Sequence, residues 1–369
     1  MAELRLEDLG KAFGTIWAVR DVTLTVADGE FVTLLGPSGC GKTTTLRMIA
    51  GFVPPTAGQI LVVGRVISSG AAGIMLPPER RGMGMVFQSY AVWPHMDAFH
   101  NVAYPLRRAG LSRPEIEART KKSLSLVHLE EYAGRYPHEL SGGQQQRIAL
   151  ARALIMEPSV LLLDEPLSNL DAKLREEMRF EIKELQQRLG ITVVYVTHDQ
   201  GEAMVMSHRV AVMSLGRVVQ VGTPDEIYEA PATPFVASFL GVATFLRGEV
   251  VGREGAGVRV RLPAADGATI SAAPPTGGGE PGPGSRVLVC IRPEALRFDP
   301  QGVLRGRIVR RAYLGSALDY LVQVGSESIR IVLPAGSPVP TGERVTLSVT
   351  RATLYPETSE TTSAGRSAT

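Results

Sequence analysis

Nearly continuous runs of apolar, β-prone residues recur in the first two-thirds of the chain. They cover residues 30–35, 83–87, 160–163 and 191–197, and glycine or polar residues follow each run. Runs of this kind are typical of strands that a parallel sheet buries on both faces. Residues 3–26 instead alternate apolar and polar positions, which predicts antiparallel strands that lead into the first run. The pattern indicates an α/β fold whose parallel sheet is accompanied by antiparallel strands.

Helical periodicity separates some of these runs. Residues 172–189 place apolar side chains three and four positions apart, which predicts an amphipathic helix. Residues 115–127 contain good helix formers after the start signal Ser112-Arg113-Pro114. The helices predicted over residues 115–127 and 144–154 together indicate a helical subdomain at about residues 90–157.

The composition and the hydrophobic pattern of the sequence change in the last third of the chain. Residues 245–262 and 286–350 are rich in Val, Leu, Arg and Gly with strand-like alternation. This pattern favours a small all-β barrel of the OB-like type over residues 241–356. Residues 264–285 are dominated by Ala, Gly, Pro and Ser, so we expect a mobile loop there. Residues 357–369 lack apolar periodicity and are expected to form a disordered tail.

The composition narrows the class of protein. With 369 residues, a hydrophobic content of 44% and a mean hydropathy of +0.07, the chain suits a globular protein of two domains. No stretch approaches the roughly 18–20 apolar residues of a membrane helix, and the start lacks the features of a signal peptide. We therefore expect a cytoplasmic protein. The net charge of +2 and the lack of a recognisable aromatic-lined basic strand face predict no nucleic-acid partner.

A glycine-rich segment follows the first apolar run and precedes a helix predicted to begin near Gly41. It consists of Gly36, Pro37, Ser38, Gly39, Cys40, Gly41, Lys42 and Thr43. A glycine-rich turn between a strand and a helix exposes successive backbone N–H groups, and the helix adds its positive dipole end. In this setting we expect Lys42 to reach the β- and γ-phosphates of ATP and Thr43 to ligate Mg²⁺. The segment predicts a P-loop NTPase.

Cys40 lies inside this segment, beside Lys42 and the predicted helix N-terminus. Both neighbours lower the pKa of a thiol. We therefore expect Cys40 to be reactive, its alkylation to block ATP binding, and ATP to protect it. The alternative is that Cys40 serves only as a small residue in a tight turn. With two cysteines in the chain, a disulfide framework is not expected.

Polar side chains follow three of the apolar runs. Asp164 and Glu165 end the third run, His198 follows the fourth, and Gln88 follows the second. Functional residues gather at the carboxyl ends of strands in open α/β sheets. Asp164 is then expected to hold the Mg²⁺ shell, and Glu165 to orient or deprotonate the attacking water. His198 could hydrogen-bond the γ-phosphate, and the Gln88 amide oxygen could ligate Mg²⁺.

A second glycine-rich segment, Leu-Ser-Gly-Gly-Gln, precedes the helix predicted over residues 144–154. Ser141 can cap that helix, with Gln144 at capping-box spacing. Gly142 and Gly143 permit a close approach of the backbone to an anion. One phosphate chain does not need two helix N-termini from a single chain. The two segments are explained together if each nucleotide contacts both copies of a closed, two-fold head-to-tail dimer.

In their order along the chain, these segments resemble the motifs of the nucleotide-binding subunit of an ABC transporter. They match Walker A, the Gln88 loop, the LSGGQ signature, Walker B, the loop at residues 168–171 and the His198 loop. The resemblance implies an ABC ATPase cassette at residues 1–240, with antiparallel β and helical subdomains. The region at residues 241–356 resembles the regulatory TOBE domain of binding-protein-dependent importers.

The resemblance implies roles in nucleotide and metal binding. Phe13 matches the aromatic position that stacks on adenine, and Trp17 is a rival for this role. The residues from Gly36 to Thr43 would surround the phosphates, with the Thr44 hydroxyl near the α-phosphate. Mg²⁺ would be held by Thr43, Gln88 and Asp164.

The resemblance also implies the catalytic residues and a contribution from a partner subunit. Glu165 would be the general base, with His198 on the γ-phosphate and Gln88 beside the attacking water. The partner in a homodimer would contribute Ser141, Gly142, Gly143, Gln144 and Asp171.

Two further positions bear on this resemblance. Arg292-Pro293-Glu294 matches a motif that usually begins the core of such TOBE domains. His208 stands where the family usually has an acid, which puts the local packing in question.

The implied function is ATP hydrolysis coupled to solute import at the cytoplasmic face of the inner membrane. Membrane permease subunits would contact the segment from Gln88 to Met96, whose aromatic and methionine residues suit an interface. A solute-binding protein would take part indirectly. Ferric iron or polyamines are the favoured solutes, and sugars are the alternative. A soluble, non-transport ABC ATPase is a more distant alternative, because the segment between the two glycine-rich motifs is short.

Overall fold

The computed structural model describes residues 3–254, 257–275, 279, 281–336 and 338–357. The chain divides into two compact units, residues 1–224 and 225–369. The disordered tail predicted for residues 357–369 lies, from residue 358 onward, outside the described residues.

An antiparallel sheet opens the first unit, with strand order β2-β1-β4-β5-β6. Its strands are β1 (Leu4–Phe13), β2 (Ile16–Val26), β4 (Ala57–Val62), β5 (Arg65–Ser69) and β6 (Ile74–Met75). The alternating positions Leu4 and Leu6 of β1 are buried, as are Val22 and Leu24 of β2. The antiparallel strands predicted from this alternation are confirmed.

A second sheet of the first unit has the order β11-β10-β3-β9-β8-β7. Its strands are β3 (Phe31–Leu35), β7 (Met83–Val86), β8 (Val160–Asp164), β9 (Thr192–Thr197), β10 (Arg209–Ser214) and β11 (Arg217–Gly222). All pairings are parallel except that of β10 with β11. Every residue of β3, β8 and β9 is buried, as the continuous apolar runs predicted.

The register of this sheet brings the predicted functional residues to one edge. Leu35 at the end of β3 pairs with Thr197 at the end of β9, and Asp164 at the end of β8 pairs with Val196. The segments after β3, β8 and β9 therefore leave the sheet side by side.

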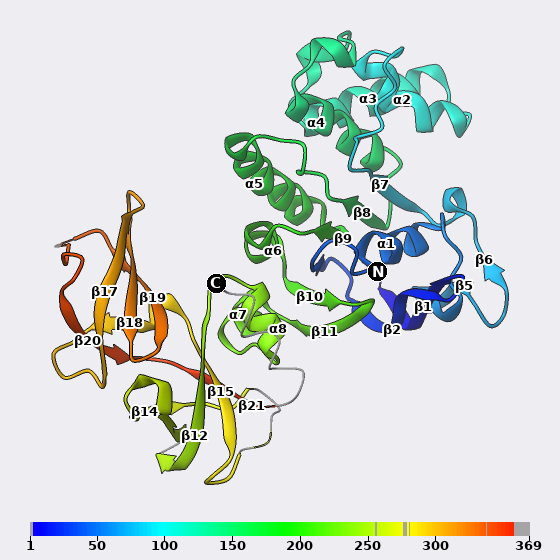
Figure 1. The fold of residues 1–369 in the computed structure, drawn as a ribbon. Helices are drawn as coiled ribbons and strands as arrows, with labels where there is room; N and C mark the ends of the chain where they lie inside the picture. Colours follow the sequence, from blue (N-terminus) through cyan, green and yellow to red (C-terminus); the bar gives the residue numbers. More distant parts are fainter. Residues whose placement is uncertain (1–2, 255–256, 276–278, 280, 337, 358–369) are drawn as a thin grey trace. The chain divides into compact units, whose positions relative to one another are not determined.

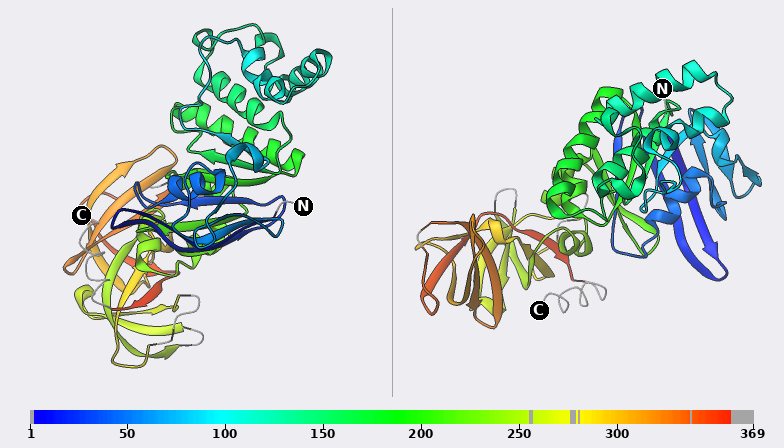
Figure 2. Two further views of the ribbon diagram at one scale, coloured as in Figure 1. Left: turned by 90° about the vertical axis from the view of Figure 1, so that its right-hand side faces the viewer. Right: turned by 90° about the horizontal axis from the view of Figure 1, so that it is seen from above.

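The helices of the first unit form two groups. The helices α1 (Lys42–Ala50), α5 (Ala172–Leu189) and α6 (Gln200–Met206) accompany the sheets, with the short helix η1 at Pro78–Arg80. The other group contains α2 (Ala98–Arg108), α3 (Arg113–Leu126) and α4 (Gly142–Leu154), with the short helices η2 (Glu130–Tyr132) and η3 (Pro137–Glu139). Figures 1 and 2 show α2, α3 and α4 gathered together. They share a core of their own, which includes Val102, Leu106, Leu124 and Ile148.

The second unit consists mainly of two antiparallel sheets. The first has the order β14-β13-β12-β15-β21, with β12 (Thr244–Glu254), β13 (Gly257–Leu262), β14 (Ala268–Ala272), β15 (Arg286–Ile291) and β21 (Thr353–Pro356). The second has the order β16-β20-β17-β18-β19, with β16 (Leu296–Phe298), β17 (Leu304–Tyr313), β18 (Ala317–Val324), β19 (Glu327–Pro334) and β20 (Arg344–Val349). The helices are α7 (Pro224–Glu229), α8 (Pro234–Phe239), η4 (Pro263–Ala265) and η5 (Pro293–Ala295).

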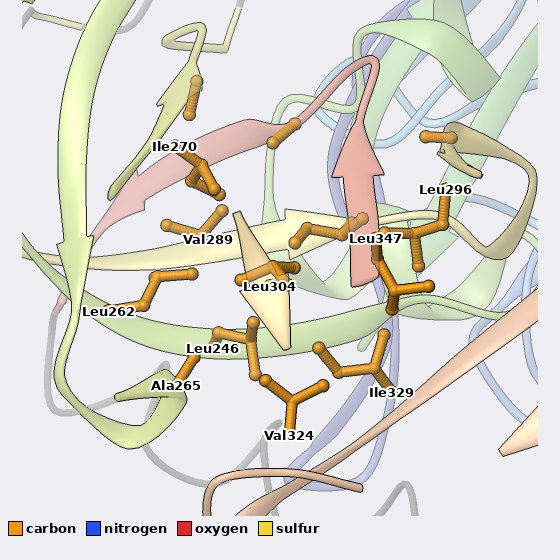
Figure 3. Close-up of a cluster of buried hydrophobic side chains, with 14 of the residues drawn as sticks. Leu246, Leu262, Ala265, Ile270, Val289, Leu296, Leu304, Val324, Ile329 and Leu347 are labelled. Carbon is orange, nitrogen blue, oxygen red and sulfur yellow. The ribbon is translucent and has the colours of Figure 1, made fainter. Parts of the chain in front are cut away.

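The two sheets of the second unit share one hydrophobic core. Leu246 and Val289 come from the first sheet, and Leu304, Val324 and Leu347 come from the second. Figure 3 shows these side chains directed into the same interior. The small all-β domain predicted from the sequence texture is confirmed.

The mobile loop predicted at residues 264–285 is wrong in its first part. Residues 268–272 form β14, which pairs with β13 and buries Ile270 and Ala272. The connection between the two strands consists of η4 followed by Asp266 and Gly267, whose φ angles are 54° and 74°. Asp-Gly is a strong signal for a hairpin turn, but the small side chains around it obscured the alternation of the strand.

Residues 225–240 belong to the second unit. The boundary between the units thus precedes residue 225, whereas we predicted it after residue 240. Arg292 explains the attachment of residues 225–240. Its guanidinium donates hydrogen bonds to the carbonyl oxygens of Leu240 and Tyr228 and lies 3.9 Å from the centre of the Tyr228 ring. The Tyr355 hydroxyl donates to the Pro231 carbonyl oxygen at 3.0 Å. The Arg292-Pro293-Glu294 motif thus holds α7 and the end of α8 to the β domain.

None of the helices in the described part of the chain is both long and apolar enough to cross a membrane.

Candidate functional site

The glycine-rich turn between β3 and α1 packs closely against the backbone of β10 and β2. A Cβ atom on Gly36 would lie 2.4 Å from the carbonyl oxygen of Met213 on β10. Gly41 has a φ of 103°, and a Cβ atom there would lie 2.5 Å from the Ala18 carbonyl oxygen. Neither position can hold a side chain without moving backbone. Pro37, Ser38 and Gly39 form the exposed crest of the turn.

Lys42 is held inside this turn. Its side chain is 5% exposed, and its ammonium donates to the carbonyl oxygens of Gly36 at 2.7 Å and Pro37 at 3.0 Å. Those hydrogen bonds satisfy a buried charge that forms no ion pair with a carboxylate in the described part of the chain. A phosphate bound at the turn would replace these carbonyl groups as the hydrogen-bond acceptor of the Lys42 ammonium. The neighbouring Thr44 lies half-buried in the first turn of α1.

The low thiol pKa that we predicted for Cys40 is wrong. The Cys40 side chain is 2% exposed, and burial raises the pKa of its thiol. Lys42 and the backbone hydrogen bonds act in the opposite direction, but the loss of solvation is the larger effect. The alternative reading, in which Cys40 fills a tight turn, fits the structure.

Thr43 and Asp164 form an oxygen-rich pair at the base of the turn. The Thr43 hydroxyl donates to Oδ1 of Asp164 at 3.0 Å. Asp164 is 4% exposed, and burial raises the pKa of its carboxyl group against the effects of Thr43 and Arg47. A hydroxyl and a buried carboxylate are ligands that Mg²⁺ accepts, and a cation would compensate for the lost solvation. The predicted metal ligands therefore fit the ion, with Gln88 nearby at the same edge.

Glu165 lies between two of the predicted functional residues. Its Oε2 atom accepts from Nε2 of Gln88 at 3.4 Å and lies 3.2 Å from Nδ1 of His198. The side chain of Glu165 is 18% exposed, and that of His198 is 56% exposed. The structure thus brings together an acid, an imidazole and an amide that follow three different strands. This arrangement can orient a water molecule and accept its proton.

The backbone of Glu165 is strained. Its φ is 45°, in the left-handed region that non-glycine residues rarely adopt. Its N–H donates to the Val196 carbonyl oxygen at 3.0 Å, and its own carbonyl oxygen accepts from the Ser168 hydroxyl at 2.9 Å. Asn169 adds a hydrogen bond of 2.8 Å from its amide to the Gln88 carbonyl oxygen. These bonds hold the acid in a conformation that its neighbours determine.

A buried network supports the strand end that carries His198. The hydroxyl groups of Tyr195 and Thr197 donate to Oε2 of Glu202 at 2.8 Å and 2.5 Å. The N–H of Asp199 donates to the Thr197 hydroxyl at 2.9 Å, so the network passes directly beside His198. Glu202 is 3% exposed, and burial raises the pKa of its carboxyl group.

Asp199 links this network to α5. Its Oδ1 caps α6 by accepting from the Glu202 N–H at 3.0 Å. Its Oδ2 accepts from Arg179 at 3.1 Å and lies 3.6 Å from Arg175. Sequence reasoning did not identify Asp199 or Glu202, although an aspartate directly before a short helix is a cap signal.

The second glycine-rich segment forms the predicted capped helix start. The Gln144 N–H donates to the Ser141 hydroxyl at 3.3 Å, and the Ser141 N–H donates to the Gln144 amide oxygen at 2.9 Å. The predicted capping box is confirmed. A Cβ atom on Gly143 would lie 2.9 Å from Cδ2 of Leu174, so a larger residue there would have to displace this leucine of α5.

Asp171 lies next to this helix start. It caps α5 by accepting from the Leu174 N–H at 3.0 Å. The same leucine packs on Gly143, and Leu170 approaches Gly142. The residues predicted to act on a partner's nucleotide thus form one surface at the starts of α4 and α5. Their hydrogen bonds are local to these helix starts.

Phe13 and Trp17 lie on the hairpin of β1 and β2. Phe13 is 55% exposed, and the Lys11 ammonium lies 5.1 Å from the centre of its ring. Trp17 packs onto Gly10, where a Cβ atom would lie 2.9 Å from its ring. Arg20 lies 5.6 Å from the centre of the Trp17 ring. Phe13 therefore packs less against the rest of the protein than Trp17 does and is more accessible to a ligand.

Two side chains that sequence reasoning missed form hydrogen bonds with the backbone of the segment from Gln88 to Met96. Asn101 is fully buried, accepts from the Trp93 N–H and donates to the carbonyl oxygens of Trp93, Met96 and Asp97. Arg152 donates to the carbonyl oxygens of Tyr90 and Ala91. The Arg152 guanidinium also lies 4.6 Å from the centre of the Trp93 ring. A lone asparagine or arginine in a helix gives no sequence signal for such a role.

His208, which stands where the family pattern has an acid, makes two hydrogen bonds with the backbone of Phe31. Its Nδ1 atom accepts from the Phe31 N–H at 2.8 Å, and its own N–H donates to the Phe31 carbonyl oxygen at 2.9 Å. An imidazole nitrogen thus serves the backbone amide at the start of β3 as an acceptor.

Comparison with known families assigns both units of the chain. Residues 19–168 match the model described as "ABC transporter", and residues 289–355 match the model described as "TOBE domain". The first range includes the glycine-rich turn, the capped start of α4 and the acids after β8.

Curated relatives match most of the chain. A spermidine/putrescine import ATP-binding protein of Rubrobacter xylanophilus is 49% identical over 87% of this chain and 83% of its own length. An Fe(3+) ions import ATP-binding protein of Rhizobium meliloti is 47% identical over 88% of this chain and 89% of its own length. A second Fe(3+) ions import ATP-binding protein, from Rhizobium etli, is 46% identical over 91% of this chain and 94% of its own length.

Solved structures match the first unit. A dimeric cassette in a post-hydrolysis state with ADP and Pi has a TM-score of 0.52 and 34% identity, covering 60% of this chain and 98% of that one. CbiO1 of Clostridium perfringens, part of an ABC transporter complex, has a TM-score of 0.56 and 32% identity, covering 61% and 89%. From its site geometry, its two matched domains and its relatives, the chain belongs to the ABC transporter family, as an import ATP-binding protein with a C-terminal TOBE domain.

Proposed function

We propose that the protein hydrolyses ATP to drive solute import, with Glu165 as the general base. The observation that carries this assignment is the position of its carboxylate between Gln88 and His198. The Thr43–Asp164 pair that follows β3 and β8 lies at the same edge of the sheet. An acid beside a phosphate-binding turn is the arrangement that water-mediated phosphoryl transfer requires.

The residues of this chain divide the work of hydrolysis. The turn from Gly36 to Thr43 surrounds the phosphates, with the Lys42 ammonium released from the turn carbonyl groups. Glu165 accepts the proton of the attacking water, His198 donates to the γ-phosphate, and Gln88 orients the water. Thr43, Gln88 and Asp164 would hold Mg²⁺, which neutralises phosphate charge when bound. Phe13 would stack on the adenine, because Trp17 is already packed.

The complete site requires a second copy of the chain. Ser141, Gly142, Gly143, Gln144 and Asp171 would contact the nucleotide of the partner. Two features support this arrangement: these residues share one surface at the starts of α4 and α5, and the related cassette with ADP and Pi is dimeric. ATP would then join two subunits head to tail.

The favoured solutes are ferric iron and polyamines. Relatives at 46–49% identity that cover most of the chain are named for these solutes. The protein would act at the cytoplasmic face of the membrane, where permease subunits dock on the segment from Gln88 to Met96. Uptake of ferric iron and of spermidine, compared in cells with and without the protein, separates the two solutes.

The Glu165→Gln variant tests the proposed mechanism. A glutamine keeps the size of the side chain but cannot accept the proton, so kcat should fall by at least about a hundredfold. ATP binding should stay unchanged when measured with a fluorescent analogue. Glu177→Gln, on the exposed face of α5, is the matched control and should keep normal turnover. Normal hydrolysis by Glu165→Gln would rule out Glu165 as the base.

A further inference from the structure

A groove in the second unit is lined by three arginines. In the ladder between β17 and β20, Arg307 lies directly opposite Arg344, and Arg305 lies opposite Thr346. Side chains two residues apart share one face of a strand, so the three arginines project from the same face. The groove has a volume of about 670 Å³, and its other lining residues include Pro300, Gly302 and Gly306.

The positive charge of this groove is uncompensated. Within the described residues, none of the three arginines forms an ion pair, whereas Arg330 on β19 lies 2.8 Å from Asp319 of β18. Like charges placed directly opposite each other in a sheet destabilise it. The pairing of Arg307 with Arg344 is therefore unfavourable, and neither guanidinium is held by an ion pair within the described residues.

The groove is also partly pre-organised. Arg307 donates from Nε to the Gly342 carbonyl oxygen at 2.9 Å, which fixes the stem and leaves its two terminal nitrogens available. The Gln323 amide at the groove is already engaged, because it accepts from Ser328 and donates to the Gly325 carbonyl oxygen. The guanidinium groups are therefore the charged donors that remain available on this face.

We propose that this groove binds the phosphate groups of a small molecule. Guanidinium groups bind phosphate oxygens in a bidentate manner, and several on one face suit an anion of more than one charge. The lining residues include no aromatic side chain on which a nucleic-acid base could stack. This binding is separate from the P-loop and does not depend on the transport function proposed above.

Pyrophosphate is a suitable probe, titrated calorimetrically into the full-length protein. All samples carry Lys42→Ala, which weakens anion binding at the P-loop. Arg307→Gln with Arg344→Gln removes the facing pair. Arg310→Gln with Arg311→Gln is the matched control, since it changes the same strand region and the same net charge outside the groove.

The groove variant should bind pyrophosphate at least about tenfold more weakly than the control. The control should bind like the parent, and both variants should give native circular dichroism spectra. Equal affinity in both variants, or no binding by the parent, would overturn the proposal.

Vesicles of phosphatidylcholine with phosphatidylglycerol distinguish a lipid headgroup from a free phosphate. Co-sedimentation with these vesicles should be the same for the groove variant and the control. Sedimentation that depends on Arg307 and Arg344 would assign the groove to a membrane surface and overturn the small-molecule proposal.

Discussion

Single buried side chains determine how firmly the catalytic edge is held, and Glu202 is one of them. Burial raises its pKa above the ordinary value of 4.5, so the folded protein binds this proton more tightly than the unfolded chain. The resulting stability is present below about pH 4.5 and is lost as the pH rises through the folded-state pKa. Glu202→Gln keeps the acceptor oxygen for Tyr195 and Thr197 and does not titrate.

We therefore expect Glu202→Gln to gain stability relative to the unmodified protein as the pH rises from 4 to 7. Urea unfolding at several pH values measures this difference. A difference that stays constant with pH would show that the pKa of Glu202 is the same in the folded and the unfolded protein.

The two cysteines give a second prediction. Cys40 and Cys290 are both buried, and burial raises the pKa of Cys290 to about 11. Because burial raises the pKa of both thiols and shields them from reagents, alkylation of the native protein by iodoacetamide at pH 7.5 should be at least about tenfold slower than in urea. Mass spectrometry of the labelled peptides gives both rates. Rapid labelling of native Cys40 would restore the reactive thiol that its neighbours in the sequence suggested.

Among the secondary-structure elements, α7 and α8 are held to the β domain by several contacts, and Arg292 makes three of them. Arg292 holds them through two carbonyl groups and the Tyr228 ring, and lysine cannot reproduce this set of contacts. Arg292→Lys should lower the free energy of unfolding of the second unit by about 2–4 kcal/mol and expose residues 225–240 to proteolysis. Arg259→Lys, on an exposed position of β13, is the control and should leave both unchanged.

The elements could be predicted where one local pattern determines them. The buried runs at β3, β8 and β9 and the capped start of α4 follow from periodicity and capping chemistry. The strand β14 was not predicted, because alanine and glycine hide its alternation. Asn101, Arg152 and Glu202 were missed for another reason. Their roles depend on partners that only the tertiary fold brings near, such as the backbone of residues 90–97 and the Thr197 hydroxyl.

For the molecule as a whole, the decisive prediction concerns the second copy. In the Glu165→Gln background, ATP should produce a dimer in size-exclusion chromatography. Adding Ser141→Arg should abolish this dimer, because a long cation would occupy the surface proposed to meet the partner's nucleotide. ATP binding to the monomer should remain, although loss of the cap costs about 1 kcal/mol.

Ser112→Arg is the matched control for this experiment. Ser112 precedes α3 at the cap position and makes no capping hydrogen bond with its side chain. It should leave ATP-driven dimerisation intact. A dimer that persists in the Ser141→Arg protein would place the interface elsewhere.

The left-handed backbone of Glu165 sets activity against stability. Glycine adopts a φ of 45° at little cost, whereas a residue with a side chain pays about 1–3 kcal/mol to stay there. Glu165→Gly should therefore melt at a higher temperature than the active protein while turnover is lost. The strain at this position is then the cost of placing the proposed general base beside the phosphate-binding turn.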